Sequence, residues 1–226
     1  MNTKTEREPR QETAASPAEV VREFGPLAAG KPVAGVTFDG SRVWAALGDQ
    51  LVAIDPESGD VTQTLNCAGD AGTAFDGKHL WQIAESRIDK IDPRTGKVLA
   101  SIPAPGGGSD SGLTWAEGSL WVGNYRGRTI QQVDPATGAV QRTIESNRFV
   151  TGVTWVDGEL WHGTWEAEES EVRRIDPASG EVLQRLQMPP GSGVSGLESD
   201  GADLLYCGGG PSGKVRVVRR PKARHN

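Results

Sequence analysis

Cysteine is scarce in this chain, which has only Cys67 and Cys207 among its 226 residues. Two thiols are too few for the disulfide framework that stabilises small secreted domains. Long apolar runs are missing as well, because no stretch reaches the roughly eighteen apolar residues that a membrane-spanning helix needs. Residues 1–19 also lack the apolar core of a signal peptide. We therefore expect a soluble, cytoplasmic protein.

Positive charge is in deficit. The sequence has 24 lysines and arginines against 30 aspartates and glutamates, which gives a formal net charge of -6. A general nucleic-acid binder needs a basic surface that releases the counterions of the phosphate backbone, and an anionic membrane attracts basic surfaces. The composition therefore predicts that neither nucleic acid nor membrane is a partner. A small-molecule or peptide substrate is the partner that we expect.

Glycine, proline and tryptophan are abundant, with 30, 14 and 7 residues. Such a composition is typical of short strands joined by tight turns around large packing side chains. A turn of the form Asp-Pro-x-Ser/Thr-Gly begins at Asp55, Asp92, Asp134 and Asp176, at spacings of 37, 42 and 42 residues. The aspartate caps the turn, the proline presets φ and the glycine takes the left-handed position, so each copy predicts a hairpin.

A second hairpin precedes each of these turns. Its first strand begins with a glycine and its second contains an apolar residue followed by an aromatic one, in copies that start at Gly35, Gly72, Gly112, Gly152 and Gly196. Two hairpins make four short strands in about 40 residues, the size of one propeller blade. The sequence therefore predicts an all-β fold, a five-bladed β-propeller, with the repeated tryptophans packed between blades.

The fifth unit lacks a fourth strand, because it has lost the Asp-Pro turn and stops after Val218. Residues 19–24 resemble the fourth strand of the fourth unit, so we expect this N-terminal strand to close the last blade and the ring. The predicted blades span about 33–67, 68–105, 106–147, 148–189, and 190–220 with 19–24, in one domain over 17–220. We predict that residues 1–16 and 221–226 are disordered tails. An open array that dimerises is the alternative to the monomer that we expect.

The candidate site lies at the mouth of the central channel, because the variable loops gather there while the blades stay rigid. Glu198 stands on an innermost strand where the other units have small residues, so we predict it as a catalytic acid or base. A carboxylate bonded to channel water or backbone is the alternative. His162 follows the repeated tryptophan and is a second candidate acid or base. Its alternative is a packed, hydrogen-bonded side chain between blades.

Trp165 lies outside the tryptophan repeat and is a candidate for stacking on a ligand. The loop face supplies the other predicted substrate-binding residues, which are Asp110, Asn124, Tyr125, Arg148 and Cys207. Asp70 and Asp110 are each either a loop cap or a polar hook for substrate. Cys67 and Cys207 fall in units that become neighbours when the ring closes, and a metal or redox pair is one reading of them. No paired-ligand spacing accompanies them, so we predict no metal site and no cofactor.

The run from Gly152 to Gly180 carries the sequence Leu-Trp-His-Gly-Thr-Trp at 160–165, followed by the Ile-Asp-Pro-x-Ser-Gly turn. It resembles a blade of the bacterial and plant-type glutaminyl cyclotransferases, which are five-bladed propellers. Residues 194–206 resemble their final blade, and the same blade type occurs in virginiamycin B lyase-like propellers. The resemblance implies a cyclotransferase or lyase, with Trp165 as a substrate-stacking residue by position. The acidic residues that the cyclotransferases have in the strand equivalent to 150–155 are absent here.

Two functions from different classes fit these features. The first is a lyase or cyclotransferase that acts on a small polar or peptide-like substrate, with Glu198 as the base and His162 and Trp165 beside it. The second is a non-catalytic module that binds a metabolite or a protein loop on the same face, and a scaffold with a water-filled channel is a third. Convergence of Glu198, His162 and a loop aspartate on one cavity would favour chemistry.

Overall fold

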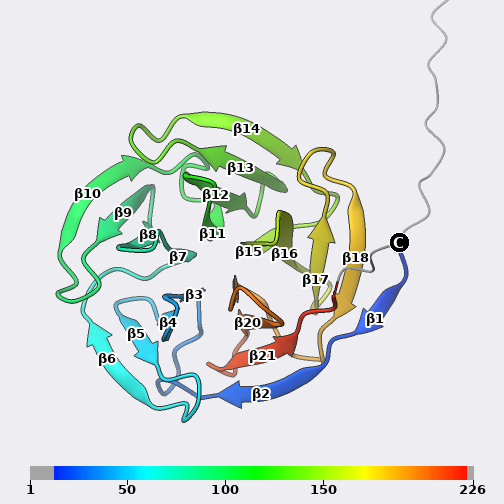
Figure 1. Ribbon diagram of the computed structural model, residues 1–226, viewed down its shortest axis with the longest axis horizontal. Coiled ribbons are helices and arrows are strands. Elements are labelled where there is room, and N and C mark those ends of the chain that lie inside the picture. Colours follow the sequence, from blue (N-terminus) through cyan, green and yellow to red (C-terminus); the bar gives the residue numbers. More distant parts are fainter. Residues whose placement is uncertain (1–12, 223–226) are drawn as a thin grey trace, which may run out of the picture.

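A computed structural model describes residues 13–222 of the chain. In this part, five sheets are arranged around a central axis as the blades of a propeller, and no residue is helical (Figure 1). The prediction of an all-β, five-bladed propeller is therefore confirmed. The first strand of each repeat lies nearest the axis and the fourth lies at the rim (Figure 1). Residues 13–222 contain no helix that is long and apolar enough to cross a lipid bilayer.

Each of the first four blades is built from four strands that follow one another in the chain. Blade 1 contains β3 (Gly35–Phe38), β4 (Val43–Ala46), β5 (Leu51–Ile54) and β6 (Val61–Leu65). Blade 2 contains β7 (Thr73–Phe75), β8 (Leu80–Ala84), β9 (Arg87–Ile91) and β10 (Val98–Pro103). Blade 3 contains β11 (Asp110–Ala116), β12 (Ser119–Asn124), β13 (Thr129–Val133) and β14 (Val140–Glu145). Blade 4 contains β15 (Val150–Val156), β16 (Glu159–Glu166), β17 (Glu169–Ile175) and β18 (Val182–Gln187).

Blade 5 joins the two ends of the chain. It contains β19 (Gly196–Ser199), β20 (Leu204–Gly208) and β21 (Val215–Arg219), and its fourth strand is β2 (Val20–Phe24), which pairs antiparallel with β21. Phe24 of β2 is buried in a hydrophobic cluster with residues of blades 1 and 5. Glu23 forms ion pairs of 2.9 Å with Lys214 and Arg216. The predicted closure of the last blade by the N-terminal strand is confirmed.

β1 (Ala15–Pro17) is a strand that the sequence does not predict. It pairs in parallel with β18 and adds a fifth strand to the outer edge of blade 4. The prediction of a disordered tail over 1–16 is therefore wrong for residues 15 and 16, and residues 1–12 lie outside the described residues. The side chains of β1 are exposed and show no apolar alternation, so the strand is specified by backbone pairing and by hydrogen bonds to the open edge of β18, such as that from the Ser16 hydroxyl to the Arg185 carbonyl. Of the other predicted tail, 221–226, residues 223–226 also lie outside the described part.

The Asp-Pro turns have the local geometry that the sequence predicts. In blade 1, Oδ1 of Asp55 accepts hydrogen bonds from the backbone N–H groups of Glu57 (2.8 Å) and Ser58 (2.9 Å). The glycine that ends this turn has a φ of +81°, which favours glycine over other residues. Asp134 and Asp176 cap their turns with the same two bonds. Because all of these groups are close in the sequence, the motif alone specifies them.

The repeated tryptophans pack between blades. The ring of Trp121 in blade 3 stacks on the ring of Trp155 in blade 4 with a centroid distance of 5.1 Å. In the first two blades an aspartate of the preceding turn accepts the indole N–H. The distances are 2.8 Å from Trp44 to Asp39 and 2.9 Å from Trp81 to Asp76. This bond satisfies the single polar atom of each buried ring.

Trp121 lacks such a bond, because its Nε1 is buried and has no hydrogen-bond partner among the described residues. In blade 4 the residue two positions before the tryptophan is Glu159, which accepts the N–H of Trp161 at 3.3 Å, whereas blade 3 has Ser119 there. Ser119→Gln and Ser119→Met both lose the hydrogen bond that the Ser119 hydroxyl accepts from Gln132 at 3.1 Å, but only the glutamine supplies an acceptor for Trp121. We expect the free energy of unfolding of Ser119→Gln to be about 1 kcal/mol higher than that of Ser119→Met in a urea titration. Ser119→Met, which has similar length but no acceptor, is the control. Equal stabilities of the two variants would contradict the prediction.

Five glycines bring the innermost strands unusually close together. They are the first glycines of the five repeats, Gly35, Gly72, Gly112, Gly152 and Gly196. A Cβ added to any of them would collide with the backbone of the next blade, and the series returns from Gly196 to Gly35. Only glycine permits this approach of one backbone to another. We call this set the glycine ring. At these five residues the innermost strands lie closest to one another, and the central channel is narrow there.

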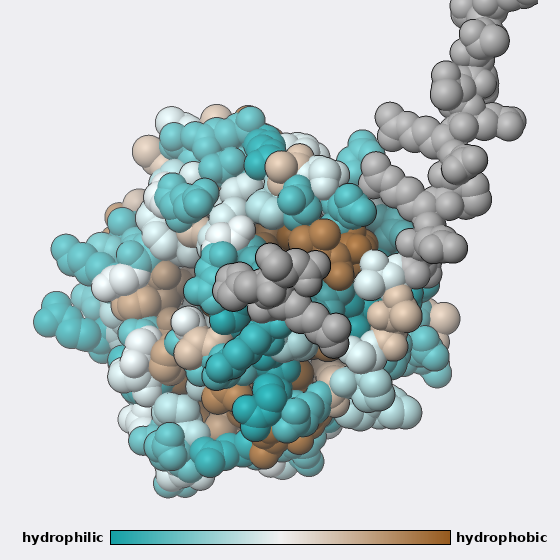
Figure 2. Space-filling model, turned by 45° about the vertical axis from the view of Figure 1, so that its right-hand side comes forward, coloured by the Kyte–Doolittle hydropathy of each residue, from teal (hydrophilic) through white to brown (hydrophobic). Residues whose placement is uncertain are grey.

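Large exposed apolar side chains are spread around the rim. They lie on the outer strands of all five blades, at Val21, Val61, Val98, Leu99, Val140 and Leu183. On the face seen in Figure 2, hydrophobic areas are separated by hydrophilic ones. Single apolar side chains of this kind are normal on a protein surface.

Candidate functional site

The loop face carries a cavity of about 430 Å³ beside the glycine ring. All five blades contribute to it, through the loops that enter the innermost strands and the ends of the second strands. Its lining comprises Pro32, Val33, Ala34, Asp70, Ala71, Asp110, Ser111, Tyr125, Thr151, Trp165, Gly193, Val194, Ser195, Gly210 and Pro211. A cavity of this size suits a small ligand. We call it the loop-face cavity.

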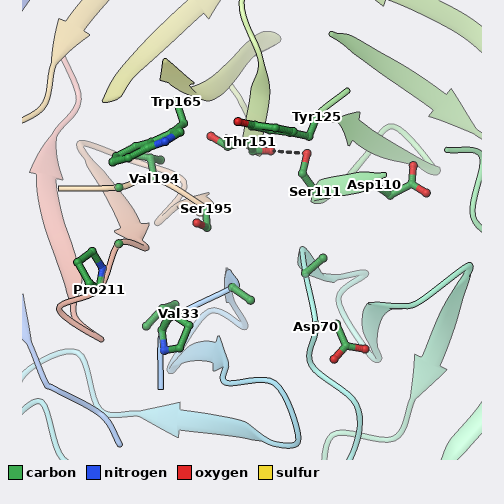
Figure 3. A pocket seen from close by; sticks show the side chains of 15 residues that line it. Val33, Asp70, Asp110, Ser111, Tyr125, Thr151, Trp165, Val194, Ser195 and Pro211 are labelled. Carbon is green, nitrogen blue, oxygen red and sulfur yellow. Dashed lines mark hydrogen bonds between the residues drawn. The ribbon is translucent and has the colours of Figure 1, made fainter. Parts of the chain in front are cut away.

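One side of the loop-face cavity is acidic. Asp70 and Asp110 lie on this side in Figure 3. The backbone N–H of Gly106 lies 3.0 Å from both carboxylate oxygens of Asp110, and burial raises the pKa of this carboxyl group above its ordinary value. Among the described residues that line the cavity none is Lys, Arg or His. The fixed charge of the lining is therefore negative.

The other side is aromatic and apolar. Trp165, Val194 and Pro211 lie opposite the two aspartates in Figure 3, and the Tyr125 ring lies between the two sides. Tyr125 stacks on Phe149 with a centroid distance of 4.6 Å. A ring that is supported in this way offers a flat surface at a fixed position. The cavity therefore has one acidic side and one aromatic and apolar side.

Two of the predicted binding residues support the loop-face cavity without lining it. Arg148 forms an ion pair with Glu166, the residue that follows Trp165. Asn124 accepts a hydrogen bond of 2.6 Å from the backbone N–H of Gly127 through its Oδ1. Both side chains therefore fix loops that carry the aromatic residues. Of the predicted substrate-binding residues, the structure brings together Asp110, Tyr125 and Trp165.

Glu198 lies on β19, two residues beyond the glycine ring, and does not line the loop-face cavity. Its Oε2 accepts a hydrogen bond from the Thr37 hydroxyl at 2.9 Å, and its Oε1 accepts bonds from the Thr154 hydroxyl and from the Ser199 N–H, the latter at 2.9 Å. Burial raises the pKa of Glu198 to about 7 against the effect of these donors. The carboxylate thus joins blades 5, 1 and 4 within the channel, out of contact with the cavity.

His162 lies on β16 and is 1% exposed. Its Nδ1 is 2.9 Å from the carbonyl oxygen of Gly163, and burial lowers the pKa of the imidazole to about 4. The ring lines a different cavity, between blades 3 and 4. The structure therefore does not bring His162 together with Glu198 or Asp110. The predicted catalytic pair gains no support from its placement.

Cys207 is fully buried on β20, and burial raises the pKa of its thiol to about 12. It packs in a hydrophobic cluster with residues of blades 4 and 5, whereas Cys67 packs against a cluster of blades 1 and 2. Both are free thiols. The described residues contain no group of three or more His, Cys, Asp or Glu side chains placed to hold a metal ion. A protonated thiol is a poor nucleophile. Cys207 packs in the hydrophobic core and does not line the loop-face cavity.

Five residues that line the cavity share one repeat position and were not among the predicted site residues. Ala34, Ala71, Ser111, Thr151 and Ser195 each stand immediately before a glycine of the ring, and all five line the cavity. The Ser111 hydroxyl lies 3.3 Å from the carbonyl oxygen of Thr151, as the dashed line in Figure 3 marks. The Thr151 hydroxyl is buried without a partner among the described residues. The position directly before the first glycine of each repeat is the sequence signal that could have identified this set.

Comparison with known proteins supports the fold. No protein-family model matches the chain, and no curated protein matches its sequence. Among solved structures, a glutaminyl cyclase from Myxococcus xanthus has a TM-score of 0.74 at 18% identity, over 89% of this chain and 95% of that one. The β-propeller domain of Cps50 (Swd1) from Myceliophteria thermophila has a TM-score of 0.57 at 10% identity, over 91% of this chain and 100% of that one.

The WD40 repeats of RRP9 are also similar, with a TM-score of 0.55 at 10% identity, over 92% of this chain and 99% of that one. At such low identities these likenesses show the propeller fold alone. Propellers serve both as enzymes and as binding modules, so the fold does not choose between the two. The chemistry of the loop-face cavity, and not the fold, therefore bears on the function.

Proposed function

We propose that the loop-face cavity binds the primary ammonium group of a small peptide-like substrate, and that the protein is a cyclotransferase of the glutaminyl cyclase type. The observation that carries the proposal is the division of the cavity into an acidic side and an aromatic side with no basic residue in the lining. An ammonium group would lie beside Asp70 and Asp110, and the apolar part of the substrate would lie against Trp165. The reaction class is the one implied by the resemblance of residues 152–180 to a blade of the glutaminyl cyclotransferases.

Cyclisation of an N-terminal glutamine forms a bond between the amine nitrogen and the side-chain amide carbon, and it releases ammonia. The bound ammonium group loses one proton before its nitrogen attacks and a second as the lactam forms. The leaving nitrogen gains both protons and departs as ammonium, so a single carboxylate can carry each proton from the first nitrogen to the second. Asp110 suits this role because burial raises the pKa of its carboxyl group towards the working pH. The Gly106 N–H holds the carboxylate in one orientation. No other species is consumed.

Binding without chemistry is the second candidate function. It is favoured by the Gly106 N–H, which already occupies both oxygens of Asp110 as it would in a purely structural cap. It is also favoured by Glu198 and His162, which do not line the cavity. In this case the cavity would hold the same class of amine and release it unchanged. The two candidates therefore share their ligand and differ in turnover.

A glutaminyl dipeptide amide with a free amine tests both candidates. We expect it to bind, measured by calorimetry, at least tenfold more tightly than its N-acetylated analogue, because acetylation removes the positive charge that the aspartates attract. Asp110→Asn is expected to weaken binding about tenfold and to abolish ammonia release. Asp60→Asn removes an exposed carboxylate from a turn outside the cavity and serves as the control.

The outcomes separate the two candidates. Amine-dependent binding with ammonia release supports the cyclotransferase. Amine-dependent binding with no ammonia release contradicts that reaction and supports the binding module. If the acetylated and free dipeptides bind equally, the cavity does not recognise an ammonium group and both candidates fail.

A further inference from the structure

A second cavity, of about 420 Å³, lies between blades 3 and 4. Its lining comes from the end of β14, from the turn before β18 and from β16, and comprises Thr13, Glu145, Ser146, Asn147, His162, Ile175, Ser179, Gly180, Glu181 and Val182. It shares no residue with the lining of the loop-face cavity. Glu145 and Glu181 are exposed on it, and none of its described lining residues is Lys or Arg. We call it the inter-blade cavity.

His162 gives the inter-blade cavity a buried hydrogen-bond acceptor. Nδ1 faces a carbonyl oxygen, which only accepts, so Nδ1 carries the proton and Nε2 carries the lone pair. Burial keeps the ring neutral, since it lowers the pKa of the imidazole to about 4. None of the residues 13–222 forms a hydrogen bond with Nε2. Because His162 lines the inter-blade cavity, Nε2 can accept a hydrogen bond from a water molecule or a ligand there.

An arginine on the strand next to His162 is already paired with a carboxylate. Arg173, which pairs with His162 across the sheet, donates through Nε to Glu171 at 2.8 Å and through Nη1 to Asn147 at 2.7 Å. Glu171 is buried, yet Arg185 and Arg173 hold the pKa of its carboxyl group at about 2. Glu145 and Glu181 are the only charged residues among the described residues that line the cavity, so the fixed charge of this lining is negative.

We propose that the inter-blade cavity is a second binding site, for a cationic hydrogen-bond donor of the alkylguanidinium class, such as an arginine side chain. A guanidinium group presents five N–H donors in one plane and has no acceptor. The cavity lining offers the complement, because it contains the buried imidazole of His162 and the exposed carboxylates of Glu145 and Glu181. An alkylammonium has its donors on a single atom and reaches fewer of these acceptors. This site does not depend on the function proposed for the loop-face cavity.

Titration with ethylguanidinium tests the site, followed by nitrogen-15 NMR of the histidine rings of the full chain. The sequence has three histidines, so the His162 signals are readily assigned, and His79 on another blade is an internal reference. We expect the Nε2 signal of His162 to move saturably towards the value of a protonated nitrogen as it accepts a hydrogen bond. We expect Glu181→Gln to weaken this binding about fivefold.

Asp60→Asn is the matched control, because Asp60 follows the turn glycine of blade 1 as Glu181 follows that of blade 4, with no such cavity beside it. It should leave the titration unchanged, and so should Trp165→Ala in the loop-face cavity. Three results would overturn the proposal. They are an unmoved Nε2 signal, an unchanged affinity in Glu181→Gln, and an ethylammonium affinity equal to that of ethylguanidinium.

Discussion

Glu198→Gln is expected to raise the free energy of unfolding at about pH 8 by roughly 3 kcal/mol, and to change it little at about pH 4. The reason is the burial of this carboxyl group on an innermost strand, which raises its pKa to about 7 from an ordinary value of 4.5. An amide of the same shape carries no charge at either pH. The variant therefore removes the energy of burying a carboxylate.

The sign of the effect follows from proton binding. Between pH 4.5 and about 7 the folded state holds a proton on Glu198 that the unfolded chain has released. The contribution of Glu198 to the free energy of unfolding is therefore fully present below pH 4.5. It falls as the pH rises and is lowest above about pH 7. The hydrogen bonds from Thr37, Thr154 and Ser199 limit the loss, because they favour the ionised form.

The measurement is a series of urea titrations of the unchanged protein and the variant across this pH range. Other groups titrate in both proteins, so the difference between the two curves isolates Glu198. Glu117→Gln, at an exposed turn, is the control and should give no pH-dependent difference. A difference that stays constant between about pH 4 and pH 8 would show that Glu198 is not buried in the folded protein.

Gly152→Ala is expected to lower the free energy of unfolding by about 3 kcal/mol or more. The added Cβ would lie 2.6 Å from the backbone nitrogen of Leu197 and 2.7 Å from the carbonyl carbon of Gly196, which real Cβ atoms do not approach. Backbone atoms of the neighbouring blade cannot rotate away as a side chain does, so blades 4 and 5 would have to separate. Thr151 and Ser195 stand beside these glycines in the cavity lining, so ligand binding should fall as well.

Gly118→Ala is the control for this substitution. Gly118 lies in a hairpin turn with a φ of +74° and no atom within 4 Å of an added Cβ. Its replacement introduces backbone strain of only about 1–2 kcal/mol. Thermal and urea unfolding measure the loss of stability in each variant, which comes from a steric clash in Gly152→Ala and from local backbone strain in Gly118→Ala. Equal losses in the two would mean that the innermost strands are not in contact at the glycine ring.

Much of the fold was predictable because its determinants are local and repeated. The Asp-Pro-x-Ser/Thr-Gly turn is specified by bonds such as those of Asp55, which reach only two and three residues along the chain. The count of repeats then determined the number of blades, and the missing fourth strand of the last repeat indicated that residues 19–24 close the ring. β1 was not predictable, because its exposed residues are ordered only by the edge of β18, a distant part of the chain.

The candidate site was predictable only in part. The sequence by itself determined that the loops gather at one end of the channel, and it identified Asp110, Tyr125 and Trp165 among the residues there. The tertiary structure alone decided which carboxylate lines the loop-face cavity. Asp110 stands two residues before a glycine of the ring and faces the cavity, whereas Glu198 stands two residues after one and lies in the channel beyond it. The physical reason is that the ring forms from backbone contacts between blades about 40 residues apart, which no local pattern encodes.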